Sequence, residues 1–142
     1  MSTSVPGLPA AALPAIKQGQ IYWVRAKDLD IEGSEQQRNR PYLIVSRDII
    51  NTLGKNVVGV PLSTKLHKAC AHRVLIPALL MVKNPAWPPL GSPWPPLETS
   101  VALTDHIRVL DSGRLAQPSM GSLAQTAVGG IELGLAFLLD IR

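Results

Sequence analysis

Short runs of β-forming residues, separated by polar and turn-forming residues, limit the fold of this chain more than any other feature. Four such runs lie at residues 20–26, 41–46, 57–64 and 72–77. In the first run, QIYWVRA, Ile21 and Trp23 share one face. Tyr22 and Val24 share the other, and this two-residue period is that of a β-strand. We therefore expect a mainly β protein.

The C-terminal part adds further strand residues and a helix. Residues 100–111 predict one long strand, or two short strands broken near Asp105. Residues 122–139 predict a helix, because one stripe at spacings of three and four is apolar: Leu123, Ala127, Ile131, Leu135 and Leu138. Glycines at 129, 130 and 134 each cost about 1 kcal/mol relative to alanine, so this helix should pack closely against another surface. Together these elements predict a small antiparallel sheet or barrel with a C-terminal α-helix.

Proline and tryptophan dominate residues 83–98, KNPAWPPLGSPWPPLE. Proline lacks the backbone N–H that helices and central strands need, so this segment is expected to be a long, partly polyproline-like surface loop. Residues 1–18 are also rich in proline and almost uncharged, which is typical of a flexible arm. Residues 19–142 then form one domain.

Charge and cysteine content narrow the possible functions without selecting one. The net charge of +4 is compatible with a polyanionic partner, but it is also ordinary for a chain of 142 residues. The single cysteine, Cys70, excludes an intrachain disulfide and a zinc site built on cysteine pairs. No run of residues is long and apolar enough to span a bilayer, so we expect a cytoplasmic protein with no membrane partner.

Charged residues gather in the loop before the second strand. This loop, IEGSEQQRNR, holds Glu35, Arg38 and Arg40 and is followed by Pro41. A solvated loop is the ordinary explanation of such charges. However, a proline pushes the preceding residue, Arg40, into an extended conformation and so fixes where its side chain emerges. An arginine held in this way can direct its planar fork at a phosphate.

Hydroxyl and basic residues follow the third strand. Ser63, Thr64, Lys65 and His67 are either a phosphate site or an ordinary strand cap. Alternation directs Ser63 towards a groove and places Thr64 on the expected core face, with the large apolar residues Val58, Val60 and Leu62.

Three other features leave alternatives open. Asp105 interrupts two apolar strand pieces, where it either caps a bulge or faces a site. Tyr22 and Trp23 could stack on nucleobases, although at least one of them should belong to the core. The histidines at 67, 72 and 106 have no partner at metal-ligand spacing, so no metal site is predicted.

Three blocks of the sequence resemble, in the same order, the MazF/PemK toxin family: GQIYWVRAKDLDIEGSEQQRNRPYLIVSRDIIN, VVGVPLSTK and SVALTDHIRVLDSGRL. The resemblance covers residues 19 to about 140, and GSEQ followed by RP is its most specific part. It implies an SH3-like barrel of the CcdB/MazF type with a C-terminal helix, forming a homodimer. It also implies a sequence-specific endoribonuclease that cleaves single-stranded RNA without metal or cofactor and is neutralised by a cognate antitoxin.

The resemblance also implies roles for individual residues. In this family the ribose 2′-hydroxyl attacks the adjacent phosphorus and leaves a 2′,3′-cyclic phosphate. Arg40 matches the catalytic arginine, Ser63 matches the position of the catalytic threonine, and Glu35 matches a loop glutamate that acts as a base or orients the arginine. The residues expected to bind substrate are Arg38, Thr64, Lys65, His67 and Asp105.

The chain also departs from the family pattern. Serine replaces threonine at 63, Asn39 stands where some members have histidine, and the loop at 83–98 is longer. A non-catalytic homologue that binds only antitoxin or nucleic acid, or that poisons DNA gyrase, is the alternative function. The gyrase poisons depend on a tryptophan-containing C-terminus, whereas this chain ends in LLDIR. Arg40 and Ser63 favour the enzyme.

Overall fold

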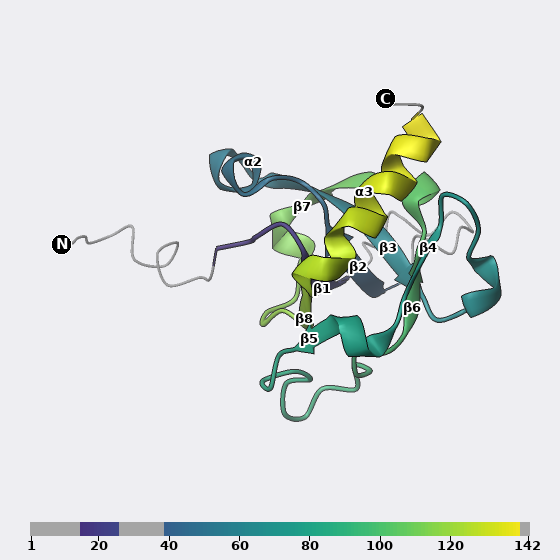
Figure 1. Ribbon diagram of the computed structural model, residues 1–142. Coiled ribbons are helices and arrows are strands. Elements are labelled where there is room, and N and C mark those ends of the chain that lie inside the picture. The colour runs from purple at the N-terminus through teal and green to yellow at the C-terminus, as the bar shows by residue number, and fades with distance from the viewer. Residues whose placement is uncertain (1–14, 26–38, 140–142) are drawn as a thin grey trace.

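The computed structural model describes residues 15–25 and 39–139 (Figure 1). The described strands are β1 Gln20–Val24, β2 Arg40–Ile44, β3 Asn56–Ser63, β4 Val74–Ile76, β5 Met81–Lys83, β6 Ser100–Ala102, β7 Arg108–Asp111 and β8 Gly121–Leu123. The described helices are α2 Asp48–Leu53 and α3 Gln125–Leu139, with the short 3₁₀ turns η3 Leu66–Lys68, η4 Ala78–Leu80, η5 Thr104–His106 and η6 Ser112–Arg114. The structure is mainly β, as the sequence predicts.

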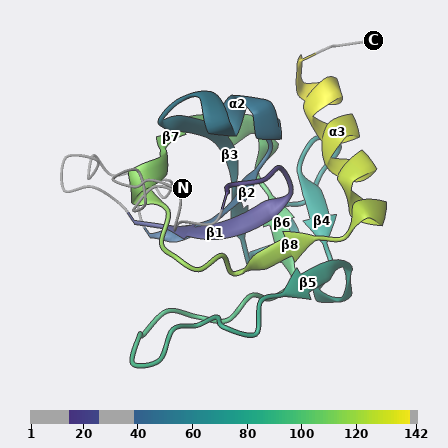
Figure 2. The same ribbon diagram turned by 90° about the vertical axis from the view of Figure 1, so that its left-hand side faces the viewer.

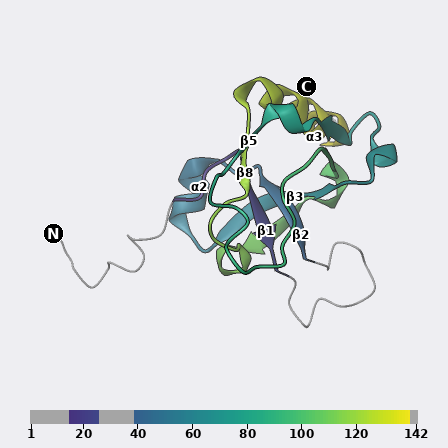
Figure 3. The same cartoon turned by 90° about the horizontal axis from the view of Figure 1, so that it is seen from below.

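The strands form one antiparallel sheet in the order β4–β6–β3–β2–β1–β8–β5. β3 changes its partner along its length. Residues 56–59 pair with β7, Leu62 and Ser63 pair with β6, and the other edge of β3 pairs with β2. The sheet curls round on itself in Figure 2, and Figure 3 shows its central strands β1, β2 and β3 side by side. The predicted small antiparallel barrel with a C-terminal helix is confirmed.

Both faces of the central strands are buried. One core cluster includes Ile21, Trp23, Leu43, Val60 and Leu62. The second is made of Tyr22, Val24, Tyr42, Ile44, Val57, Leu110 and Leu115. The alternation predicted for the first strand is confirmed, because successive residues of β1 enter different clusters. With apolar side chains on both faces, the ends of these strands are where polar groups can reach a ligand.

α3 packs most closely against the β4 region at Gly134, whereas a Cβ atom at Gly130 would make only an ordinary contact of 3.7 Å with Val74 Cγ1. A Cβ atom at Gly134 would lie 2.7 Å from Val74 Cγ2 and 2.8 Å from the carbonyl oxygen of His72. At Gly129 a Cβ atom would meet nothing within 4 Å. The close packing predicted from the helix glycines is therefore confirmed for Gly134 and is wrong for Gly129, which is exposed.

The predicted helix start at residue 122 is wrong, because α3 begins at Gln125. Ser122 and Leu123 belong to β8, where Ser122 pairs with Gln20 of β1 and Val82 of β5. Leu123 fits the helical stripe only because strand pairing also turns it into the core, where it is 7% exposed.

Residues 84–99 form a long loop without helix or strand, as predicted, and it extends below β8 in Figure 2. Its tryptophans, however, pack inward. The rings of Trp87 and Trp94 are stacked with centroids 5.4 Å apart, and Trp94 lies 6.4 Å from Trp23 of β1. The indole N–H of Trp87 donates to the carbonyl oxygen of Pro95 at 2.9 Å. These contacts hold the loop against the barrel.

The segment before β1 is attached to the domain from residue 16 onward. Ile16 packs against the second core cluster, and the Gln18 backbone N–H donates to Asp48 Oδ1 at 2.7 Å. The rest of the expected arm, residues 1–14, lies outside the described residues. Neither described α-helix has the length and apolar character needed to cross a bilayer.

Candidate active site

A pocket of about 290 Å³ opens where the start of β2 lies beside the end of β3. Tyr42 pairs with Pro61 in the antiparallel ladder, and this register, continued by two residues, sets Arg40 level with Ser63. The strand ends contribute Arg40, Ser63, Thr64 and Lys65, and the loop after β5 contributes Pro95, Pro96 and Glu98. We call this site the Arg40 pocket. It brings together four of the residues that the sequence assigned to catalysis or substrate binding.

Arg40 is held by its backbone and by the residue that follows it. It is the first residue of β2 and pairs with Val24 of β1, while Pro41 pairs with Trp23. The Nε and Nη1 atoms of its guanidinium are shielded from solvent. A cation shielded from water acts more strongly on a nearby anion than an exposed one. Arg40 is thus placed to stabilise negative charge in the pocket.

Ser63 ends β3 and organises the turn that follows. Its Oγ accepts a hydrogen bond from the backbone N–H of Lys65 at 3.1 Å. Because this bond uses only a lone pair, the hydroxyl proton can still be donated to a ligand. The turn brings Lys65 into the pocket beside Ser63.

The sequence-based prediction that Thr64 faces the core is wrong. Thr64 is exposed and lines the Arg40 pocket together with Ser63. The strand ladder ends at Ser63, so the alternation that governs β3 no longer applies to the next residue. Both hydroxyls can therefore reach a ligand.

Two more predicted site residues do not line this pocket. His67 lies in η3 and is exposed. Asp105 lies in η5, where Arg73 donates to its two carboxylate oxygens at 2.8 and 2.6 Å. These hydrogen bonds from Arg73 lower the pKa of the Asp105 carboxyl to about 2. The same hydrogen bonds to Asp105 raise the pKa of Arg73. His72 and His106 approach the carboxylate at 3.7 and 3.9 Å. Asp105 is thus part of an ion-pair cluster between β6 and β7.

The pocket also contains residues that the sequence analysis did not assign to it. Glu98 is the single charged residue between positions 84 and 99. This isolated charge was the only feature of the sequence that could have marked Glu98 as a site residue. Pro95 and Pro96 lie beside it in the pocket wall. Trp23 is 8% exposed, and its buried indole N–H has no hydrogen-bond partner in the described part of the chain. Glu35 and Arg38, which the sequence places in the same loop as Arg40, lie outside the described residues.

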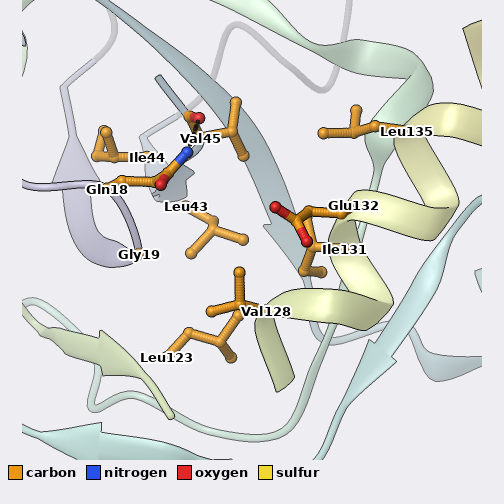
Figure 4. Close-up of a pocket in the computed structure, with 10 residues that line it drawn as sticks. All are labelled: Gln18, Gly19, Leu43, Ile44, Val45, Leu123, Val128, Ile131, Glu132 and Leu135. Atoms are coloured by element: carbon orange, nitrogen blue, oxygen red, sulfur yellow. Dashed lines mark hydrogen bonds between the residues drawn. The ribbon is translucent and has the colours of Figure 1, made fainter. Parts of the chain in front are cut away.

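A second, apolar pocket of about 50 Å³ lies between α3 and β2 (Figure 4). Leu43 and Val45 of the β2 side face Val128, Ile131 and Leu135 of α3 across it. Gln18 and Glu132 supply polar groups at its edge. Arginine, lysine and hydroxyl side chains are missing from its lining, so it is poorly suited to bind a phosphate. The Arg40 pocket remains the candidate active site.

Within residues 15–25 and 39–139, no cluster of three or more His, Cys, Asp or Glu side chains could hold a metal ion. The prediction that the chain works without metal stays a prediction.

Comparison with known proteins identifies the family. The model of the PemK-like, MazF-like toxins of type II toxin–antitoxin systems matches residues 17–139. No curated protein matches the chain.

Three similar solved structures support the same fold. An endoribonuclease from a mycobacterial species is 24% identical, with a TM-score of 0.63 over 92% of this chain and 96% of its own. A mycobacterial endoribonuclease in complex with its cognate antitoxin is 22% identical, with a TM-score of 0.59 over 92% and 98%. MazF from Deinococcus radiodurans is 21% identical, with a TM-score of 0.64 over 91% and 100%. The family match over most of the chain and the shared barrel show that this protein belongs to the PemK-like, MazF-like toxins of type II toxin–antitoxin systems.

Proposed function

We propose that this protein is an endoribonuclease toxin that cleaves single-stranded RNA at specific sequences in the cytoplasm. The observation that carries the proposal is the Arg40 pocket, in which a guanidinium at the start of β2 lies level with a hydroxyl at the end of β3. Lys65 and Thr64 add a further cation and hydroxyl to the same site. Similar solved structures include proteins described as endoribonucleases, which supports this assignment.

In the proposed reaction the ribose 2′-oxygen attacks the adjacent phosphorus, and the bond from phosphorus to the 5′-oxygen breaks. The products are a 2′,3′-cyclic phosphate and a 5′-hydroxyl. Negative charge grows on the non-bridging oxygens during the attack, and Arg40 is the group that stabilises it. Ser63, Thr64 and Lys65 donate hydrogen bonds that hold the phosphate in place.

We assign two further roles to residues outside the described part of the chain. Glu35 takes the proton from the 2′-hydroxyl or orients Arg40, and Arg38 binds the RNA backbone. A proton must also reach the leaving 5′-oxygen, and this step needs only water or one of the site's acids. Metal and cofactor have no part in this mechanism.

We also propose that the protein forms a homodimer and is inhibited by a cognate antitoxin. α3 carries large apolar side chains in solvent, with Leu133, Phe137 and Leu139 exposed by 73%, 64% and 57%. Among its described residues only Glu132 is charged. Exposed apolar surface of this kind marks protein interaction sites. Two of the similar proteins were solved in complex with their antitoxins, which supports the second partner.

Replacing Arg40 with alanine tests the proposed function. The Arg40→Ala protein should cleave a long RNA about 100- to 1000-fold more slowly, because a preorganised charge donor is lost from the transition state. Arg47→Ala is the matched control, since Arg47 is exposed and lies outside the Arg40 pocket. Cut sites are mapped by primer extension on RNA treated with purified protein, with and without excess EDTA.

Cleavage by the wild type should persist in EDTA and leave 2′,3′-cyclic phosphate ends. Full activity of the Arg40→Ala protein would refute the assignment of this site. An activity that disappears in EDTA and returns with magnesium would refute the metal-independent mechanism. A wild-type protein that binds RNA but never cuts it would favour the non-catalytic alternative.

A further inference from the structure

The Arg40 pocket has two chemically different walls. The ends of β2 and β3 offer cations and hydroxyls, whereas the loop at residues 84–99 offers the rings of Pro95 and Pro96 and the carboxylate of Glu98. A nucleotide has the same division, with an anionic phosphate at one end and a flat base with a polar edge at the other. The cationic wall suits the phosphate, so the loop wall is left for the base.

The loop wall is held in a fixed position. Pro95 accepts the indole hydrogen bond of Trp87 at 2.9 Å, and Trp94 stacks on Trp87. Leu97, which directly follows the two prolines in the chain, is 3% exposed and belongs to the first core cluster. The Glu98 carbonyl oxygen accepts from Ser100 Oγ at 2.8 Å. The backbone on both sides of Glu98 is therefore anchored, and less entropy is lost when a ligand binds to it.

The Glu98 side chain is exposed, and within the described residues its carboxylate makes no hydrogen bond or ion pair. Both oxygens are free to accept hydrogen bonds from a ligand. A carboxylate repels phosphate, so its presence in a pocket with Arg40 and Lys65 calls for a ligand group rich in N–H donors. In single-stranded RNA these donors are found on the base edges.

We propose that Glu98 selects guanine at one position next to the cleaved phosphate, with Pro95 and Pro96 against the face of the base. This inference rests on the proposed ribonuclease function. The Watson–Crick edge of guanine presents N1–H and the N2 amino group side by side, which matches the two oxygens of one carboxylate. Uracil presents a single N–H between two carbonyl oxygens, which the carboxylate repels. Adenine and cytosine each offer one amino group on this edge.

The first experiment measures base preference. Wild type, Glu98→Gln and the control Glu132→Gln each cleave a randomised RNA pool, and the bases around each cut are counted by sequencing. Glu132 is an exposed carboxylate in the apolar pocket next to α3. In wild type and in the control, guanine should be favoured over uracil at one fixed position. The expected preference is roughly 5- to 150-fold, which is the discrimination that one bidentate contact to a base provides. The Glu98→Gln protein should lose most of this preference.

The second experiment tests the contact itself. Inosine lacks the N2 amino group of guanosine, so placing inosine at the selected position removes one of the two donors. The substitution should weaken binding by wild type and leave binding by Glu98→Gln almost unchanged. RNA with a 2′-deoxyribose at the attacked nucleotide cannot be cleaved by the proposed route, so binding is measured without the chemical step.

The outcomes separate this inference from the proposed function. If wild type cleaves without selecting guanine, or if Glu98→Gln selects it equally well, the inference is overturned and the ribonuclease stands. If Glu98→Gln is slower by the same factor on every sequence, Glu98 acts in the chemical step and the base-reading role is wrong. If wild type cuts no RNA, the proposed function fails. Binding of RNA in which every guanosine is replaced by inosine, measured for wild type and Glu98→Gln, then decides alone whether Glu98 reads the base.

Discussion

Gly134 is the point at which α3 touches the backbone of the strand region beneath it, and replacing it with alanine tests that contact. Alanine is favoured over glycine within a helix by about 1 kcal/mol. At Gly129 nothing lies within 4 Å of the new methyl group, so Gly129→Ala should stabilise the protein by about that amount. At Gly134 the same gain is opposed by contacts of 2.7 Å with Val74 Cγ2 and 2.8 Å with the His72 carbonyl oxygen.

The two obstacles at Gly134 differ in how easily they move. The methyl group of Val74 can shift, because the side chain is only partly buried. The His72 carbonyl is backbone, so relieving it requires α3 to move away from the sheet. Forcing an extra methyl group into a packed interface costs typically 1–3 kcal/mol. We therefore expect Gly134→Ala to be less stable than Gly129→Ala by about 1–3 kcal/mol.

Urea denaturation of the two variants and the wild type measures this difference directly. In a domain of this size 1 kcal/mol corresponds to roughly 4 °C in thermal midpoint, so a scan should separate the variants clearly. The urea m-value should stay constant, which would show that the denatured state is unchanged. A Gly134→Ala protein as stable as Gly129→Ala would refute the close contact between α3 and the backbone at His72.

Four other variants test the site and its surroundings. Thr64→Ala should change the free energy of unfolding by less than about 0.5 kcal/mol and slow cleavage, because Thr64 is exposed in the Arg40 pocket. Ser63→Ala should slow cleavage and also cost about 1 kcal/mol of stability, since it removes a hydrogen-bond acceptor for the turn. Unchanged single-turnover rates in both variants would exclude the hydroxyls from the site. Arg38→Ala should weaken RNA binding most at low salt and reduce the slope of log affinity against log salt by about 1, as expected for one lost phosphate contact, and an unchanged slope would contradict this. Asp105→Asn should lower the free energy of unfolding by about 1–2 kcal/mol above pH 4. The folded-state pKa of Asp105 is lowered from 3.8 to about 2. The difference in unfolding free energy between Asp105→Asn and wild type should therefore vanish as the pH falls through 2. Urea unfolding between pH 2 and 6 measures it, and a difference that stays constant over this range would show that the ion pair with Arg73 is unimportant.

Local patterns predicted the parts of the fold that depend on neighbouring residues. The two faces of β1 followed from alternation, and the break at Asp105 appeared as the η5 turn between β6 and β7. Thr64 was misplaced because alternation holds only while strand pairing continues, and β3 ends one residue earlier. Leu123 was misplaced because a residue that points into the core satisfies a helical and a strand pattern equally well.

The sequence predicted the strand-end residues of the candidate site but not the residues that its loop wall contributes. Arg40 and Ser63 were expected to act together from the family resemblance, and the register of β2 with β3 brings them level. Glu98 was missed because it reaches the pocket through a loop whose path is set by tertiary contacts. The stacking of Trp87 on Trp94 and the approach of Trp94 to Trp23 join residues far apart in the chain, and no local period encodes such contacts.

The stacked tryptophans also give the protein a built-in optical reporter. The chain has three tryptophans, and all of them, Trp23, Trp87 and Trp94, lie in this one group behind the wall of the Arg40 pocket. Its intrinsic fluorescence therefore comes almost entirely from the neighbourhood of the site. The nearly parallel rings of Trp87 and Trp94, 9° apart in plane, should couple their electronic transitions and produce a paired band in circular dichroism. Because Trp23 itself lines the pocket, an unlabelled RNA bound there would change the emission, so occupancy of the pocket could be followed without a dye on either partner.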